Sequence, residues 1–256
     1  MVRAQVFQNA VCNWRCWYCY VPFDLLSGNP KNSAMLTTRE LVDLYLAEKD
    51  RPQVLDLSGG QPDLVPEWIP WMMEELMARG LHDNTYLWSD DNLSNDYFWR
   101  YLTTDDIDLV ARYSNYGRVC CFKGFDSASF TFNTLADDSL FEQQFRLMAR
   151  FIELGIDLYA YVTFTTPSAA GIAEAMARFV DRLQAVHPNL PLRTIPLKIE
   201  MFSPVEPRMD DVKKAALVHQ LAAVDAWLDQ LQERFTAGEL AAPITAVSLG
   251  HQVGTL

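Results

Sequence analysis

The sequence predicts an α/β protein built as a partial (β/α)6 TIM-like barrel that is open on one side. Six short runs rich in Val, Ile, Tyr and Phe alternate with longer helical stretches along the 256 residues. Repeated β-α-β units imply a parallel sheet with right-handed crossovers. Several runs also alternate polar and apolar side chains. A closed eight-stranded barrel fills its interior mainly with branched apolar side chains, so this alternation favours an open barrel that holds a polar ligand.

The elements follow one another in a regular order. The predicted strands cover residues 4–9, 53–58, 85–89, 118–123, 157–165 and 193–202. The predicted helices cover residues 38–49, 66–79, 96–113 in two pieces, 139–154, 170–186 and 210–235. Thr37 and Glu40 have the spacing of a capping box before the first helix, and Gly80 and Gly155 stand where helix C-caps belong.

One face of the sheet is predicted to be polar. The side chains assigned to it are Gln5, Asn9, Asp56, Ser58, Tyr159, Tyr161, Thr163, Thr165, Thr194, Lys198 and Glu200. Because helices normally cover the outside of a parallel sheet, we expect this polar face to line a cavity. The alternative is a sheet with one solvated face.

Length and composition limit the class of protein. The expected organisation is a barrel core over residues 1–204, with a C-terminal helix and tail over 205–256 packed on the same domain. A net charge of −12 disfavours a nucleic-acid partner, because such binding depends on Lys and Arg. No run has membrane-spanning length and the start lacks the apolar part of a secretory signal, so we expect no membrane partner and a cytoplasmic location.

Cys12, Cys16 and Cys19 stand close together directly after the first predicted strand. Three thiolates from one short loop can hold three irons of a four-iron four-sulfur (4Fe-4S) cluster and leave the fourth iron open to a non-protein ligand. A structural zinc site needs four protein ligands, and a ferredoxin-type site needs a fourth nearby cysteine. The other cysteines, Cys120 and Cys121, are far away in sequence. We therefore interpret the loop as an iron-sulfur site rather than a zinc site or a group of buried thiols.

This CxxxCxxC loop, with aromatic Tyr18 before the third cysteine, resembles the signature of the radical S-adenosylmethionine (radical SAM) superfamily. The resemblance implies an enzyme with a 4Fe-4S cluster on the three cysteines, S-adenosyl-L-methionine on the open iron and Tyr18 near the adenine. It also implies reductive cleavage of S-adenosylmethionine to a 5'-deoxyadenosyl radical that abstracts hydrogen from a substrate. An electron donor such as a flavodoxin or ferredoxin is then required.

The segment Ser58-Gly59-Gly60-Gln61-Pro62 resembles the family's Gly-Gly-Glu-Pro segment, which binds the amino group of S-adenosylmethionine, with Gln61 in place of glutamate. A glutamine carbonyl still accepts a hydrogen bond from an ammonium group, but the charge-assisted component is lost. By itself the segment is also an ordinary turn after a strand. We expect Ser58, Gly59, Gly60 and Gln61 to bind the cofactor.

Further cofactor contacts are expected where the other strands end, because ligands bind at the carboxyl ends of parallel strands. After the third strand, one of Ser89, Asp90 and Asp91 is predicted to reach the cofactor, with Ser89 and Asp90 as the named candidates, although such residues also cap helices. By resemblance, Thr163 and Thr165 lie along the adenine and ribose, and Phe202 belongs to the segment whose backbone contacts the adenine.

The fourth predicted strand ends close to Lys123 and Asp126. Lys123 is predicted to pair with the carboxylate of S-adenosylmethionine, and Asp126 to orient the ribose or the substrate. This segment resembles the Asp-x-Lys element of glycyl-radical-enzyme activating enzymes, with Cys121 in place of the aspartate. Lys123 and Cys121 are the candidate catalytic residues, with Cys121 as a thiol hydrogen donor or a substrate-binding group. The alternatives are an exposed lysine and an inert buried thiol.

Three functions stay open at this stage. The first is activation of a glycyl radical enzyme, which Lys123 favours. The second is a stand-alone radical SAM enzyme that modifies a small molecule or a peptide, which the polar face and the departures at Gln61 and Cys121 favour. The third is a non-catalytic iron-sulfur or zinc protein.

Overall fold

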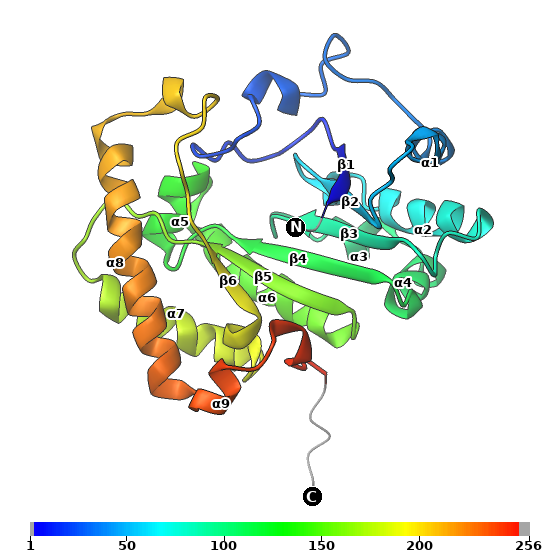
Figure 1. The fold of residues 1–256 in the computed structure, drawn as a ribbon. Helices are drawn as coiled ribbons and strands as arrows, with labels where there is room; N and C mark the ends of the chain where they lie inside the picture. Colours follow the sequence, from blue (N-terminus) through cyan, green and yellow to red (C-terminus); the bar gives the residue numbers. More distant parts are fainter. Residues whose placement is uncertain (1–2, 251–256) are drawn as a thin grey trace, which may run out of the picture. The chain divides into compact units, whose positions relative to one another are not determined.

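A computed structural model describes residues 3–250 of the chain. Six strands form one open sheet in the order β1-β2-β3-β4-β5-β6 (Figure 1). They are β1 Ala4–Gln8, β2 Val54–Ser58, β3 Tyr86–Asp91, β4 Tyr116–Phe122, β5 Asp157–Thr163 and β6 Thr194–Leu197. The pairs β1–β2, β2–β3 and β5–β6 are parallel. The predicted class, an α/β fold with a six-stranded parallel sheet that does not close, is confirmed.

Helices connect consecutive strands. The α-helices are α1 Thr38–Ala47, α2 Trp68–Ala78, α3 Tyr97–Tyr101, α4 Thr104–Arg112, α5 Ser127–Thr134, α6 Phe141–Glu153, α7 Ile172–Val186, α8 Asp211–Arg234 and α9 Ala237–Leu240. Short 3₁₀ turns, among them η2 Pro62–Leu64, η4 Leu190–Arg193 and η5 Glu206–Arg208, occupy the connections. Thr37 and Glu40 form the predicted capping box of α1. Helix α5 was not predicted, because its sequence Ser-Ala-Ser-Phe-Thr-Phe-Asn-Thr has little helix propensity and no clear apolar period.

The described chain forms two compact units. The first contains residues 3–13 and 21–119, and the second contains residues 14–20 and 120–250. Cys12 therefore belongs to the first unit, whereas Cys16 and Cys19 belong to the second.

The first unit packs helices on one face of its strands. Leu55 and Leu57 of β2 and Leu87 of β3 are fully buried, as are Ile69, Met72, Met73 and Leu76 of α2. Helix α2 also packs against α1 and α4. The opposite face carries Asp56 and, aligned with it, Val6 of β1 and Trp88 of β3.

The second unit has an aromatic core. Phe122, Phe145, Phe164, Phe179 and Trp227 pack with ring centroids 5.1 to 6.5 Å apart, many of them edge to face. Trp227 lies on α8, which runs beside α7 in Figure 1. The chain up to residue 250 docks on this unit through Arg193 Nη1, which donates to the Ile244 carbonyl at 2.9 Å, and Asn189 Nδ2, which donates to the Ser248 carbonyl at 3.2 Å. Residues 251–256 of the predicted tail lie outside the described residues.

Two strands depart from the predicted pattern of faces. Gln5 aligns with the buried Leu55 and Thr194 with the buried Ala160, so neither lies on the polar face. The alternation was correct but its phase was wrong, because a one-residue shift moves every side chain to the other face. Strand β6 ends at Leu197 rather than at residue 202, with Pro196 unable to donate to the ladder. Lys198 and Glu200 beyond it form an exposed ion pair at 2.7 Å.

None of the helices that residues 3–250 form combines the length and the apolarity needed to cross a bilayer.

Candidate functional site

The turn after β2 supports the first part of the cysteine loop. Gly59 and Gly60 both have φ of +63°, a conformation that favours glycine. A Cβ on Gly60 would lie 2.3 Å from the carbonyl oxygen of Val11 and 2.5 Å from that of Asn9. The backbone N–H of Gln61 donates to the Val11 carbonyl at 2.8 Å. Only a glycine-rich turn lets the two backbone segments approach this closely, directly before Cys12.

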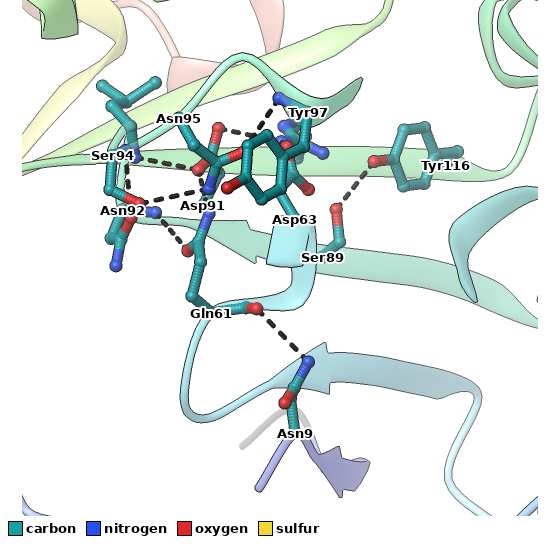
Figure 2. A network of polar contacts seen from close by, with 12 residues as sticks. Asn9, Gln61, Asp63, Ser89, Asp91, Asn92, Ser94, Asn95, Tyr97 and Tyr116 are labelled. Carbon is teal, nitrogen blue, oxygen red and sulfur yellow. Dashed lines mark hydrogen bonds and ion pairs between the residues drawn. The ribbon is translucent and has the colours of Figure 1, made fainter. Parts of the chain in front are cut away.

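Gln61 is fully buried and connects three segments of the first unit. Its Nε2 donates to Asp91 Oδ1 at 2.7 Å, and its Oε1 accepts from the backbone N–H of Asn92 at 2.9 Å. Its backbone carbonyl accepts from Asn9 Nδ2 at 3.2 Å. Figure 2 shows Gln61 between Asn9 and the loop after β3. Both ends of the Gln61 amide are bound inside the protein, and the predicted role of Gln61 toward the cofactor's amino group stays a prediction.

A buried ion network lies behind Gln61. The Arg118 guanidinium is fully buried and pairs with Asp91 at 2.8 Å and, in a shorter contact, with Asp63. Burial raises the pKa of Asp63 to about 7, Arg118 opposes the rise and the charge of Asp91 adds to it. One arginine therefore serves two buried acids, and the amide of Gln61 supplies a further donor to Asp91.

Ser89 and Asp90 lie on opposite faces of β3. Ser89 is fully buried and its hydroxyl is 2.7 Å from that of Tyr116 (Figure 2). The predicted contact of Ser89 with the cofactor stays a prediction. Asp90 accepts hydrogen bonds from Ser58 Oγ and, at 3.1 Å, from Trp88 Nε1. Ser58 and Asp90 thus come together at the carboxyl ends of β2 and β3.

Asp56 precedes Ser58 on the same face of β2. Its Oδ1 is buried without a hydrogen-bond partner. Burial raises the pKa of Asp56 to about 7, and the charge of Asp90 adds to the rise. This face of β2 and β3 therefore presents carboxyl groups, one of which titrates near neutral pH.

The second part of the cysteine loop is a tight turn in the second unit. The Cys19 N–H donates to the Cys16 carbonyl at 3.0 Å, which places the two cysteines at the two ends of one β-turn. Trp17, only 3% exposed, anchors the turn by packing with Val205 and Ala216. Arg208 Nη1 donates to the Cys19 carbonyl at 2.7 Å.

Tyr18 stands among several of the predicted site residues. Its hydroxyl is 2.9 Å from Thr163 Oγ1 at the end of β5. Burial raises the pKa of the Tyr18 phenol and the charge of Cys16 adds to this, whereas Lys123 lowers it. Cys121 also raises the pKa of the phenol, and the hydrogen bond with Thr163 lowers it. The predicted roles of Tyr18, Thr163, Lys123 and Cys121 stay predictions.

Asn133 is the main positioning residue that the sequence reasoning missed. Its Oδ1 accepts from Trp17 Nε1 at 3.1 Å and from Thr165 Oγ1 at 2.7 Å. Its Nδ2 donates to the carbonyls of Lys123 at 2.9 Å and Thr165 at 3.0 Å. Thr165 is fully buried and its hydroxyl donates to Asn133, and the prediction that Thr165 lies along the cofactor stays a prediction. The one available signal was the Asp126–Ser129 capping pair, which marks the start of α5.

Asp126 and Phe202 each form hydrogen bonds with residues close to them in the sequence. Asp126 is the N-cap of α5 and accepts a hydrogen bond from the Ser129 N–H at 2.7 Å. Its carboxylate thus caps a helix. Asp126 also lines a groove of about 780 Å³ with residues of α6 and α7. The Phe202 ring is 53% exposed, and its carbonyl accepts from the backbone N–H of Val205 at 2.8 Å.

Comparisons with known proteins bear on the fold. No protein-family model and no curated protein matches the sequence. Streptococcus suis SuiB bound to S-adenosylmethionine matches with a TM-score of 0.59 and 14% identity, over 90% of this chain and 48% of SuiB. Native anSMEcpe with bound AdoMet (S-adenosylmethionine) matches with a TM-score of 0.54 and 14% identity, over 90% of this chain and 61% of anSMEcpe. Both are radical SAM enzymes.

The chain has the radical SAM fold. The resemblance inferred from the cysteine loop is thereby confirmed for the fold, which is what a likeness at this identity shows. The chain spans about half the length of SuiB and 61% of anSMEcpe.

The donor set suits the cluster that a radical SAM fold implies. Cys12, Cys16 and Cys19 are partly exposed and none forms a disulfide. In neither described unit do three His, Cys, Asp or Glu side chains converge on a metal-sized centre. The three thiols of the loop are the candidate ligands on the ground of their spacing and chemistry alone, because soft thiolates are the ligands that iron-sulfur clusters take.

Proposed function

We propose that this chain is a radical SAM enzyme, with Cys12, Cys16 and Cys19 holding a 4Fe-4S cluster and S-adenosylmethionine as the second cofactor. The observation that carries the proposal is a loop of three thiols outside any disulfide, CxxxCxxC, directly after β1 of the radical SAM fold. Two proteins of this fold, SuiB and anSMEcpe, bind S-adenosylmethionine. When bound, the reduced cluster supplies the electron that cleaves S-adenosylmethionine to methionine and a 5'-deoxyadenosyl radical, which takes hydrogen from a substrate.

The residues of this chain position the cofactors in different ways. Gly59 and Gly60 allow the turn after β2 to lie against the backbone before Cys12, so backbone groups rather than the Gln61 side chain receive the amino group of the methionine. The Lys123 ammonium, near the Tyr18 hydroxyl, is suited to the carboxylate of the methionine. Buried Trp17 and Trp14 limit the access of water to the loop, and solvent exposure is one property that sets the potential of a cluster.

Two substrate classes have specific support. Lys123 directly after β4 resembles the element of glycyl-radical-enzyme activating enzymes, which favours a protein substrate. Asp56 and Asp90 on the open face of β2 and β3 favour a stand-alone enzyme whose small-molecule or peptide substrate carries donor groups. Either enzyme requires an electron donor such as a flavodoxin or ferredoxin.

Anaerobic reconstitution tests the proposal. The protein is loaded with iron and sulfide, reduced with dithionite and given S-adenosylmethionine, and 5'-deoxyadenosine is quantified. We expect 5'-deoxyadenosine from the wild type and none from Cys16→Ala. Cys120→Ala is the matched control, because Cys120 is fully buried in β4 and should leave the product intact.

Failure of the loaded wild type to release 5'-deoxyadenosine would leave a structural or electron-transfer metal protein. The two substrate classes are then separated by two measurements. A glycyl electron paramagnetic resonance (EPR) signal in a glycyl radical protein supports the first class, and deuterium transfer from a labelled small molecule or peptide into 5'-deoxyadenosine supports the second.

A further inference from the structure

The side-chain amide of Asn92 contacts the first cysteine of the loop. Its Nδ2 lies 3.7 Å from Cys12 Sγ and 3.4 Å from Asn13 Oδ1. The two partners are 80 residues apart in the sequence, and Asn92 is only 7% exposed. For an N–H donor to sulfur this is hydrogen-bond distance. It is a contact between a buried donor and a thiol that the proposed function assigns to the cluster.

The orientation of this amide is determined by its other contacts. Asn92 Oδ1 accepts from the backbone N–H of Ser94 at 3.0 Å, so the nitrogen of the amide, and not the oxygen, faces the sulfur. The backbone N–H of Asn92 donates to Gln61 Oε1 at 2.9 Å, which fixes the residue from the other side (Figure 2). The donor therefore stays aimed at Cys12.

The loop around Asn92 also holds a strained residue. Leu93 has φ of +56°, which is unusual for a residue with a Cβ. Its N–H donates to Asp91 Oδ1 at 2.8 Å, the same oxygen that accepts from Gln61. Such strain persists only where the surrounding contacts determine the conformation. The buried network of Gln61, Asp91 and Arg118 thus supports the position of Asn92.

We propose that Asn92 is a positioning residue that donates a hydrogen bond to the Cys12 thiolate and thereby raises the reduction potential of the cluster. The inference rests on the proposed function, because it takes Cys12 as a cluster ligand. Reduction adds negative charge to the cluster and its sulfurs, so an N–H donor stabilises the reduced state more than the oxidised state. Gln61 acts through Asn92 by holding its backbone.

A redox titration tests this directly. The reconstituted protein is titrated without S-adenosylmethionine and the reduced cluster is followed by EPR, with iron and sulfide content measured in every sample. Asn92→Leu keeps the volume and removes the donor. Asn92→Asp keeps the acceptor for Ser94 but places a carboxylate near the sulfur. Asn95→Leu is the matched control, since Asn95 lies on the same loop and its amide bonds Ser94 and Tyr97 instead of a cysteine.

The expected result is a lower equilibrium constant for one-electron reduction in both Asn92 variants. For Asn92→Leu the fall is about three- to tenfold, where tenfold corresponds to about 59 mV. For Asn92→Asp the fall is larger, and Asn95→Leu is unchanged. Clusters of normal iron content whose potentials match the wild type in both Asn92 variants would overturn the inference and leave the proposed function standing. A wild type that takes up no cluster would overturn both.

Discussion

Gln61→Glu restores the residue that the Gly-Gly-Glu-Pro segment usually carries, and we expect it to destabilise this protein. Gln61 is fully buried, and its Nε2 donates to Asp91 Oδ1 at 2.7 Å. An ionised glutamate at this position would instead place a second carboxylate oxygen at that distance from Asp91. The neighbouring Arg118 already serves Asp91 and Asp63, so it cannot neutralise a third acid.

The least costly arrangement is a protonated glutamic acid in the variant, which can still donate to Asp91. Holding this carboxyl protonated costs about 1.4 kcal/mol for each pH unit above its ordinary pKa of about 4.3. The free energy of unfolding should therefore fall by up to about 4 kcal/mol at pH 7 and by about 1 kcal/mol at pH 5. The sign follows from linkage, because the folded variant holds a proton that its unfolded chain releases above pH ~4.3.

Urea unfolding of wild type and variant at pH 5, 6, 7 and 8 measures this difference. The contribution of Asp56, which does not belong to this network, is common to both proteins and cancels. Gln232→Glu, an exposed position on α8, is the control and should change the free energy of unfolding by less than about 0.5 kcal/mol at every pH. Equal unfolding midpoints for Gln61→Glu and the wild type at pH 7 would refute the reasoning.

Three further predictions test separate features. Gly80→Ala should lower the free energy of unfolding by about 1–2 kcal/mol, and Gly60→Ala by clearly more, because both glycines have positive φ but only Gly60 has backbone atoms within 2.5 Å of the added Cβ. Equal losses in urea unfolding would argue against the contact. Asn133→Ala should cost at least about 3 kcal/mol, because it leaves buried groups of Trp17, Lys123 and Thr165 without their partner, and a variant as stable as the wild type would exclude that role. The pKa of Asp56 is raised from 3.8 to about 7, so the stability that its protonated form contributes is lost as the pH rises from about 4 to 7. Asp56→Asn should therefore flatten the pH dependence of the free energy of unfolding over that window, and parallel profiles of variant and wild type would contradict the raised pKa.

Local patterns account for the parts of the fold that were predicted. Strand and helix boundaries agreed within a few residues for most elements, because apolar periodicity and caps such as Thr37–Glu40 act within one turn or one strand. Helix α5 and the end of β6 were missed where that local signal is weak. The phase of the polar face was wrong for Gln5 and Thr194, since only pairing with the neighbouring strand selects a face.

The candidate site divides in the same way. The cysteine loop and the Gly-Gly turn could be recognised because their chemistry requires given residue types at short spacing. The internal partners of Gln61, Ser89 and Thr165 could not be predicted, because each of these side chains is bound by a buried partner from another segment.

By itself, the sequence determined an α/β chain of six strands and the three thiols of one short loop, because these depend on neighbouring residues alone. The tertiary structure decided which polar side chains support that loop. Asn92 meets Cys12 across 80 residues and Asn133 meets Trp17 across 116. Such contacts form only when parallel strands bring the ends of distant segments together, so no local pattern encodes them.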